Sequence, residues 1–389
     1  MKKKLIRITT VPASLGGLLK GQLRFMSDYY EIVGISSTGK NGHLHRIAHE
    51  EGIEVLSVEM TRKITPLKDL QATWILYKIF KKERPFIVHT HTPKAGTLGM
   101  LAAYMAGIPH RLHTIAGLPL LEARGLKRRL LDQVEKITYS CATRIYPNSY
   151  GLKDIVIENN YAKASKLHVI GNGSSNGINT SDFDPAIFNK SQEDTLRNSL
   201  QIDRDDFVFI FVGRLVRDKG VNELVNAFEK ICGTNNKVKL LLVGTYEKDL
   251  DPLEAQTELI IDTNQQIIAV GWQDDVRPFF AISDVLVFPS YREGFPNVVM
   301  QAGAMGLKCI ATDINGCNEI IIDGENGVLI PPKDEKSLKE QMELAMANVK
   351  KDQSMNYCRQ LIVERYDQMY IWKALLDEYQ KLETSQSID

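Results

Sequence analysis

Strand-like and helix-like segments alternate along both halves of the chain, and this alternation limits the fold more than any other feature. Alternating segments of this kind indicate βαβ units, which form a parallel sheet with helices on both faces. Because the 389 residues exceed what one hydrophobic core holds, we expect two such α/β domains. The expected strands are Leu5–Thr10, Glu31–Ile35, Glu54–Val58, Phe86–Thr90, Arg111–Thr114 and Arg144–Tyr146 in the first half, and Phe207–Val212, Lys239–Val243, Gln266–Val270, Val285–Phe288 and Cys309–Thr312 in the second.

The join between the two domains is expected where turn-forming residues gather. Residues 171–185 read GNGSSNGINTSDFDP, and a charged segment follows. Such a density of Gly, Asn and Ser indicates a loop or linker. We expect a first domain over residues 1–180, a second over 200–365 and a last segment over 366–389. The expected helices are Leu67–Lys82, Gly125–Ser140, Val221–Cys232, Val276–Ile282, Pro296–Met305, Glu335–Ala347 and Tyr370–Glu383.

Charge and cysteine content exclude several classes of protein. The formal net charge is zero, so the total charge gives no reason to expect a nucleic-acid partner. No apolar run approaches the roughly 20 residues that span a bilayer, and the apolar part of the N-terminus is too short for a signal peptide. The five cysteines are scattered and odd in number, which fits reduced thiols in a cytoplasm better than a set of disulfides.

The stretch 284–304, DVLVFPSYREGFPNVVMQAGA, carries the strongest functional signal. An apolar run is followed by a polar turn that contains Glu293, and Pro296 then opens a helical pattern, where its missing N–H has no intrahelical partner. Glu293 and the backbone of Gly294–Asn297 should meet where a strand's carboxyl end faces a helix N-terminus, a place that favours phosphate. A carboxylate beside an anion site repels the anion and weakens its binding, unless the carboxylate serves to bind another group, such as sugar hydroxyls. The stretch therefore suits a nucleotide-sugar.

This stretch resembles the donor-site motif of the retaining family 4 glycosyltransferases, which normally reads Glu-x7-Glu. Glu293 stands at the first position, and Gln301 replaces the second Glu. The segments THTPKAG, IAGLPL and GNGSSNGI resemble the bacterial branch that builds capsule, O-antigen or other lipid-linked glycans. The resemblance covers nearly the whole chain. It implies the GT-B fold, in which two Rossmann-like, doubly wound parallel-sheet domains face a cleft and the last helix crosses back to the first domain.

Gln301 departs from the family pattern. The resemblance implies that a carboxylate here accepts hydrogen bonds from the ribose hydroxyls of the nucleotide. Gln can still pair with a diol but loses the stronger charge-assisted bonds. We expect activity to be retained, with ribose binding weakened or rearranged. Because Glu293 and Gln301 are not two carboxylates, the acid/base pair of glycosidases is not available here.

Two cations in FVGRLVRDKGV form a second candidate site. Arg214 follows an apolar strand and Lys219 precedes a helix, a position that suits a diphosphate. Two solvated surface cations are the alternative. The spacing matches the family's G-R-x4-K diphosphate clamp, which favours the functional interpretation. Cations at this place stabilise the departing nucleoside diphosphate more in the transition state than in the ground state.

Further donor-side residues follow from weaker signals. Gly16 and Gly17 lie after the first strand, where small residues let a phosphate or sugar approach the backbone, although most Gly pairs are simple turns. The resemblance places them in the glycine loop of the first domain. GWQDDVRPFF resembles the family's base-binding loop, so the backbone around Trp272 and Val276 is expected to bind the base. Trp272 either stacks on the base or is simply an exposed or core-edge Trp. The expected donor-binding residues are Gly16, Gly17, Gly294, Phe295, Pro296, Asn297, Gln301, Trp272 and Val276.

His91, Lys94 and His113 are the candidates for the acceptor or sugar side. His89 and His91 point to the same face of one expected strand, because strand side chains alternate. They are structural histidines or a metal-like pair, and the sequence offers no further ligands with zinc-site spacing. Relatives place a sugar-contacting His directly before a Gly, whereas Ala116 stands there in this chain. Packing within its strand is therefore the alternative for His113.

The resemblance implies transfer of a sugar from a nucleotide-sugar, expected to be UDP-linked, to a saccharide or polyprenyl-diphosphate-linked acceptor. Arg214 and Lys219 would stabilise the departing phosphate, and Glu293 would hold the sugar hydroxyls. The phosphate itself would help to deprotonate the acceptor hydroxyl. No D-x-D motif is placed at this site, so we expect no metal ion and no cofactor.

Two questions stay open at this point. Residues 125–136, GLKRRLLDQVEK, form a basic amphipathic pattern that fits the inner leaflet of a membrane or a solvated helix face. The expected location is cytoplasmic, and the first of these two alternatives would make the protein peripheral on the inner membrane. A UDP-sugar 2-epimerase with a similar fold is one alternative activity. A catalytically weak nucleotide-sugar binding protein, suggested by Gln301 and Ala116, is the other.

Overall fold

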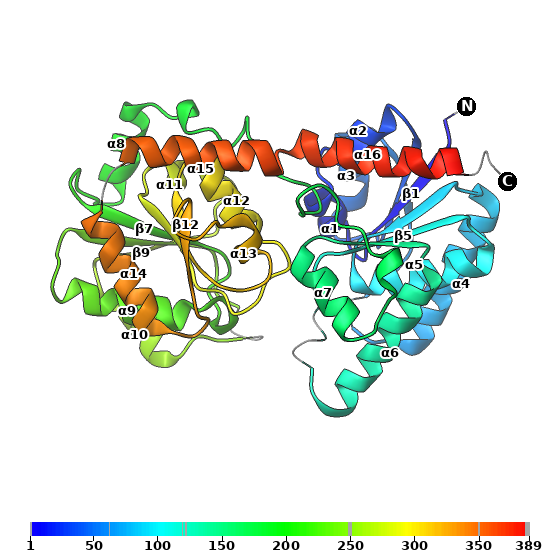
Figure 1. The fold of residues 1–389 in the computed structure, drawn as a ribbon, viewed down its shortest axis with the longest axis horizontal. Coiled ribbons are helices and arrows are strands. Elements are labelled where there is room, and N and C mark those ends of the chain that lie inside the picture. Colours follow the sequence, from blue (N-terminus) through cyan, green and yellow to red (C-terminus); the bar gives the residue numbers. More distant parts are fainter. Residues whose placement is uncertain are drawn as a thin grey trace. The chain divides into compact units, whose positions relative to one another are not determined.

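The computed structural model describes residues 2–61, 63–118, 120, 123–247, 251–348 and 351–385. It divides into two compact units, one formed by Met1–Gly177 with Gln368–Asp389 and the other by Ile178–Asp367. Both units are α/β, as the alternating pattern predicts (Figure 1). Among the described residues, no helix has both the length and the apolar character that a membrane crossing needs.

The first unit is built on a six-stranded parallel sheet with the strand order β3-β2-β1-β4-β5-β6. The strands are short, and all but β3 at the edge of the sheet are largely buried, as is usual for a parallel sheet covered on both faces. The strands are β1 Lys4–Ile8, β2 Glu31–Ser36, β3 Glu54–Ser57, β4 Ile87–Thr90, β5 His110–Ile115 and β6 Arg144–Pro147. The helices are α1 Pro12–Leu18, α2 Gln22–Ser27, α3 His43–Glu51, α4 Pro66–Glu83, α5 Pro93–Ala106, α6 Gly125–Cys141, α7 Tyr150–Glu158 and α16 Gln368–Ser385.

Helix α16 packs into the first unit although it ends the described chain. Leu375, Leu376 and Tyr379 belong to the same buried cluster as Leu5 of β1. The Tyr379 hydroxyl lies 2.6 Å from Nδ1 of His89, so a polar contact accompanies the apolar one. These contacts explain why the helical pattern near the end of the sequence has no strand after it.

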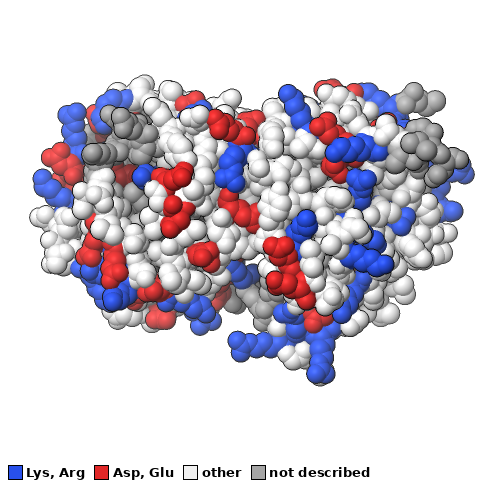
Figure 2. Space-filling model, in the orientation of Figure 1, with Lys and Arg blue, Asp and Glu red and all other residues white. Residues whose placement is uncertain are grey.

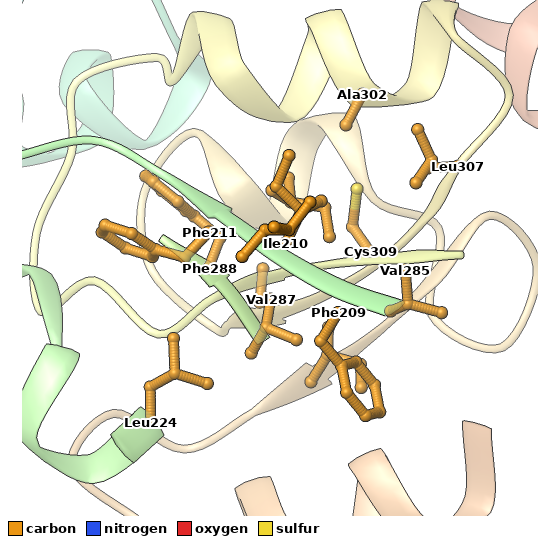
Figure 3. Close-up of a cluster of buried hydrophobic side chains, with 14 of the residues drawn as sticks. Phe209, Ile210, Phe211, Leu224, Val285, Val287, Phe288, Ala302, Leu307 and Cys309 are labelled. Atoms are coloured by element: carbon orange, nitrogen blue, oxygen red, sulfur yellow. The ribbon is translucent and has the colours of Figure 1, made fainter. Parts of the chain in front are cut away.

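The second unit has the same strand order, with its sheet running β12-β11-β10-β7-β8-β9. Its core surrounds β7 and β10, whose Phe209, Phe211, Val287 and Phe288 pack among apolar side chains of the flanking helices (Figure 3). The strands are β7 Phe207–Val212, β8 Val238–Val243, β9 Ile267–Gly271, β10 Val285–Phe288, β11 Lys308–Thr312 and β12 Gly327–Ile330. The helices are α8 Lys190–Ser199, α9 Val221–Cys232, α10 Ala255–Thr263, α11 Arg277–Ala281, α12 Asn297–Ala304, α13 Cys317–Ile320, α14 Glu335–Ala347 and α15 Lys351–Tyr366.

Several sequence predictions need correction. Gly16 and Gly17 are not in a loop but inside α1, where a Cβ on Gly16 would come within 2.9 Å of Ile47, so this Gly lets α1 pack against α3. Helix α12 begins at Asn297, with Pro296 just before it. The charged segment expected in the linker is helical, because the Asn189 side chain caps α8 in a reciprocal capping box. Strand β12 is not among the predicted strands.

Candidate active site

The candidate site of the second unit lies where the order of its strands reverses. Strands β8 and β9 follow β7 on one side of the sheet, whereas β10, β11 and β12 lie on the other side. Strands β7 and β10 are therefore neighbours, and the loops after their carboxyl ends, residues 213–220 and 289–296, lie side by side. Such a reversal is where open α/β sheets bind ligands. Arg214, Lys219 and Glu293 come from these two loops.

Gly220 allows the two loops to approach each other closely. Its φ of +70° lies in the left-handed region, and a Cβ there would come within 2.1 Å of the carbonyl oxygen of Pro289. Only Gly meets both conditions. The backbone N–H of Tyr291 donates to the carbonyl oxygen of Asp218 at 2.9 Å, which ties the β10 loop to the short helical turn Arg217–Lys219. The loop that carries Lys219 is thus fixed against the loop that carries Glu293.

Each of the two predicted phosphate-binding cations holds a carboxylate in this structure. The Lys219 ammonium forms an ion pair with Oε1 of Glu293, and both side chains are mostly buried. The Arg214 guanidinium is paired with Glu247 at 2.5 Å, and that pair is more exposed. The structure therefore brings Lys219 and Glu293 into direct contact, whereas the sequence assigned them to the phosphate and the sugar separately.

The backbone after Glu293 presents unpaired donors. The N–H groups of Gly294, Phe295 and Asn297 donate no hydrogen bond to any other described residue, and Asn297 is the first residue of α12, where an N–H has no partner within the helix. The side chain of Asn315 holds the carbonyl oxygens of Glu293 and Gly294, at 3.2 and 2.7 Å, so the loop is anchored from behind. Fixed N–H groups at a helix N-terminus are suited to bind an anion.

The remaining donor-side candidates of the second unit have different surroundings. The Phe295 ring packs edge-on against Tyr366, so its side chain belongs to the core. Only its backbone is left to contact a ligand. Trp272 follows β9 and is 71% exposed, with its indole N–H donating to Asp274 at 3.1 Å. Val276 caps α11. Gln301 lies in α12, and its side chain makes no hydrogen bond among the described residues.

The acceptor-side candidates of the first unit are engaged in its interior. Nε of Arg7 donates to Nε2 of His91 at 2.9 Å, and both side chains are buried. Lys94 is paired with Asp69 at 2.5 Å. His113 is buried, with Nδ1 lying 2.8 Å from the Thr90 hydroxyl and its ring against Gly96. Burial of this kind favours packing and hydrogen bonding within the unit as the role of His91 and His113.

The structure describes every residue of the IAGLPL segment except its prolyl residue. Residues 119, 121 and 122 lie outside the described part of the chain. Gly117 has a φ of +159°, and among the described residues beyond its two chain neighbours no atom lies within 4 Å of the place where its Cβ would stand. Residue 116, directly before Gly117, is Ala, so this chain has no imidazole at the position where relatives place one.

Three residues at the site escaped the sequence prediction. Ser290, which is fully buried, donates from its hydroxyl to Glu293 at 2.9 Å. Glu247 reaches Arg214 from the loop after β8. Asp218 lies next to Lys219, and burial raises the pKa of its carboxyl group above the usual value. No motif marks these residues, although Ser290 and Asp218 adjoin residues that the motifs contain. Glu247 meets Arg214 from another loop, which the local sequence does not indicate.

Comparison with known proteins identifies the family. Two family models match, "Glycosyl transferases group 1" over residues 192–360 and "Glycosyl transferase 4-like domain" over residues 30–173. The capsular polysaccharide biosynthesis glycosyltransferase CapM of Staphylococcus aureus is 32% identical over 381 residues, which are 97% of each chain. The Escherichia coli enzyme named UDP-Gal:alpha-D-GlcNAc-diphosphoundecaprenol alpha-1,3-galactosyltransferase is 32% identical over 316 residues, 79% of this chain and 78% of that protein.

Solved structures agree with these relatives on the fold. The crystal structure of Anabaena Alr3699/HepE in complex with UDP has a TM-score of 0.79 at 17% identity and covers 97% of this chain and 100% of that one. The likeness confirms the predicted GT-B fold. Together with a relative that is 32% identical along nearly the full length of both chains, it shows that this protein is an enzyme of the group 1 glycosyltransferase family.

Proposed function

We propose that the enzyme moves a sugar from a UDP-sugar to a hydroxyl of a lipid-linked saccharide, with retention of anomeric configuration, in the synthesis of a bacterial surface polysaccharide. The observation that carries the proposal is the meeting of Arg214, Lys219, Glu293 and unpaired backbone N–H groups at the β7–β10 reversal. The relatives' names support the substrates: CapM is named for capsule synthesis, and the enzymes of Escherichia coli and Campylobacter jejuni for diphosphoundecaprenol-linked acceptors.

In this proposal, some residues of the site act on the leaving group and others on the sugar. When the bond between the anomeric carbon and the phosphate oxygen breaks, negative charge grows on the diphosphate, and Arg214 and Lys219 stabilise it. The N–H groups of Gly294, Phe295 and Asn297 add fixed donors for the phosphate and the sugar. The acceptor oxygen forms the new bond on the same face of the sugar, and its proton passes to the departing phosphate. Glu293 accepts hydrogen bonds from sugar hydroxyls.

The base of the nucleotide is assigned to the loop after β9. Trp272 offers an exposed indole face at the carboxyl end of that strand, and Val276 offers backbone groups four residues later. Aromatic stacking of this kind accepts any base, so the preference for uracil would come from the backbone. Quenching of tryptophan fluorescence by UDP, lost in Trp272→Phe and kept in Trp74→Phe, tests this assignment.

We also propose that transfer needs no metal ion. Two cationic side chains and several N–H donors at the site are enough to meet the charge of a diphosphate. Turnover that is unchanged after treatment with EDTA supports this proposal. Loss of turnover that returns on addition of Mg²⁺ or Mn²⁺ contradicts it.

A membrane surface is the proposed place of the lipid-linked acceptor. The start of α6 exposes Leu126 and Leu130, at 81% and 52%, beside the cations Lys127 and Arg129. Figure 2 shows Lys and Arg gathered over the protruding end of this helix. Arg128 is less available, because it is paired with Asp132 at 2.7 Å. Exposed apolar side chains next to cations suit the interface of an anionic bilayer.

Helix α4 adds a second apolar face to the same unit. Leu67, Leu70 and Trp74 follow one another at helical spacing and are 86%, 70% and 50% exposed. The Lys78 ammonium lies 5.7 Å from the centre of the Trp74 ring, so a cation lies beside this face too.

Flotation of the protein with vesicles tests the membrane proposal. Flotation with vesicles containing phosphatidylglycerol, but not with neutral vesicles, is the expected result. The triple variant Leu67→Gln/Leu70→Gln/Leu126→Gln should stay unbound, whereas Leu259→Gln, on the second unit, should float normally.

The activity itself is tested by separating donor and acceptor. UDP-glucose, UDP-galactose, UDP-N-acetylglucosamine and UDP-N-acetylgalactosamine are each incubated with and without an undecaprenyl-diphosphate-linked monosaccharide. Release of UDP that depends on the acceptor, with an α-anomeric product by NMR, is expected. Conversion of the donor alone would indicate an isomerase, and tight nucleotide binding without turnover would indicate a binding protein.

A further inference from the structure

The two carboxylate oxygens of Glu293 have different surroundings. Oε1 accepts hydrogen bonds from both the Lys219 ammonium and the Ser290 hydroxyl. Oε2 accepts none from the residues that the structure describes. One oxygen is thus satisfied within the protein, and the other has its full capacity left for a ligand.

Ser290 is held in place for this contact. It follows β10 directly and is completely buried, and its carbonyl oxygen accepts from the Thr312 hydroxyl on the neighbouring strand β11. Its hydroxyl also lies 3.1 Å from the carbonyl oxygen of Arg292 and 3.4 Å from that of Asp218. A hydroxyl has one proton to donate, and Glu293 is both the nearest of the three acceptors and the charged one. The geometry therefore favours donation to the carboxylate.

Lys219 alone would not keep this carboxylate in one orientation during the reaction. Its ammonium is a point charge on a flexible stem, with three donors that turn freely. A diphosphate that binds beside it attracts the same charge, so the contact with Glu293 weakens when the donor binds. The hydrogen bond from Ser290 does not involve the diphosphate and is kept.

We propose that Ser290 is a positioning residue, which holds Oε1 of Glu293 so that Oε2 faces the sugar of the donor while Lys219 serves the phosphate. This inference rests on the proposed function, because it assigns the sugar to Glu293 and the phosphate to Lys219. It adds that the two oxygens of Glu293 have different roles. It also adds a functional residue that lies outside the Glu-x7-Glu pattern. Ser290 itself touches neither sugar nor phosphate.

The test compares UDP with UDP-sugars, because only the latter reach Glu293. Calorimetry with UDP and with each of the four UDP-sugars named above gives the gain in affinity that the sugar contributes. In Ser290→Ala, we expect UDP to bind within about threefold of the wild type. We expect kcat, and the affinity gained from the sugar, to fall about 10- to 100-fold, because a hydrogen bond to a charged group is lost. Ser283→Ala is the matched control, since its buried hydroxyl donates to a backbone carbonyl in α11.

A double-mutant cycle separates positioning from simple support of the loop. If Ser290 acts through Glu293, Ser290→Ala has no further effect on sugar affinity in a Glu293→Gln background. Equal losses for UDP and UDP-sugar in Ser290→Ala, or an effect that persists in the Glu293→Gln background, would overturn the proposal. So would an unchanged kcat. A wild-type protein that binds no UDP and gains nothing from any sugar would overturn the proposed function as well.

Discussion

The Lys219 ammonium and the Glu293 carboxylate form an ion pair between the loops that follow β7 and β10, 74 residues apart in the chain. Each group has a second neighbour, since Lys219 lies 5.7 Å from the centre of the Phe288 ring and Glu293 accepts from Ser290. The pair keeps a mostly buried cation and a mostly buried anion compensated before substrate binds. In the proposed function, a bound diphosphate becomes a second anionic partner of the Lys219 ammonium.

Replacing Lys219 by Ala should lower kcat about 10²- to 10³-fold, the usual effect of losing one preorganised group that stabilises transition-state charge. Steady-state kinetics with saturating acceptor measure this change. Lys230→Ala is the control, because that lysine forms an exposed ion pair with Glu335 elsewhere in the unit. A change confined to KM for the acceptor would show that Lys219 does not serve the diphosphate.

Replacing Glu247 by Gln should tighten UDP binding, because the Glu247 carboxylate is paired with the Arg214 guanidinium and would compete with the diphosphate for it. The pair is more than a third exposed, so its loss is worth at most about 1 kcal/mol, or about fivefold in affinity. Calorimetry with UDP on Glu247→Gln and on Glu335→Gln measures the difference. Weaker binding in Glu247→Gln alone would mean that Glu247 orients Arg214 and does not compete with the diphosphate.

Restoring the family carboxylate in Gln301→Glu should keep or improve the affinity for UDP. The Gln301 side chain has no hydrogen-bond partner among the described residues, and a carboxylate of nearly the same shape is a stronger acceptor for a ribose diol. The new carboxylate would repel the negatively charged diphosphate, which lowers the affinity. The positive charges of Arg214 and Lys219 reduce this repulsion. Gln341→Glu, on α14, is the control. Binding more than about tenfold weaker, roughly 1.4 kcal/mol, would show that residue 301 does not face the ribose.

Acid should weaken the first unit before the second, because all eight histidines lie in the first 177 residues. Burial lowers the pKa of His113 from 6.5 to about 4 and that of His89 and His91 well below 6.5. Between these values the unfolded chain binds protons that the folded chain does not, so stability falls as the pH falls below the unfolded pKa of about 6.5. His113 alone accounts for about 3 kcal/mol, lost by the time the pH reaches its folded pKa.

Hydrogen exchange at pH 7.5 and pH 5, corrected for intrinsic rates, measures this loss separately in each unit. Amides in β4 and β5 should lose protection at pH 5, whereas those in β7 and β10 should keep it. In His113→Gln the pH dependence should be smaller, and in His45→Gln, which changes an exposed side chain, it should stay as in the wild type. Equal loss in both units would contradict the assignment to these histidines.

The sequence by itself determined the class of fold and the position of the main candidate site. The expected strands Phe207–Val212 and Val285–Phe288 coincide with β7 and β10, because an apolar run bounded by turn residues is a local signal. The turn that carries Glu293 was predictable for the same reason, since Pro and Gly fix the backbone through their own covalent structure. Recognition of the glycosyltransferase family rested on these local segments.

The tertiary structure decided which of these residues touch. Gly16 and Gly17 resemble a loop in sequence, yet the packing of α1 against α3 makes them helical. His113 carries the chemistry of a ligand-binding residue, yet its position on a central strand buries it. The contacts of Glu293 with Lys219 and Ser290 depend on β10 lying next to β7, which no local pattern encodes. Neighbours along the chain set the local preference of the backbone, whereas ion pairs, burial and exceptions such as Gly16 and Gly17 are set by which segments the tertiary structure brings together.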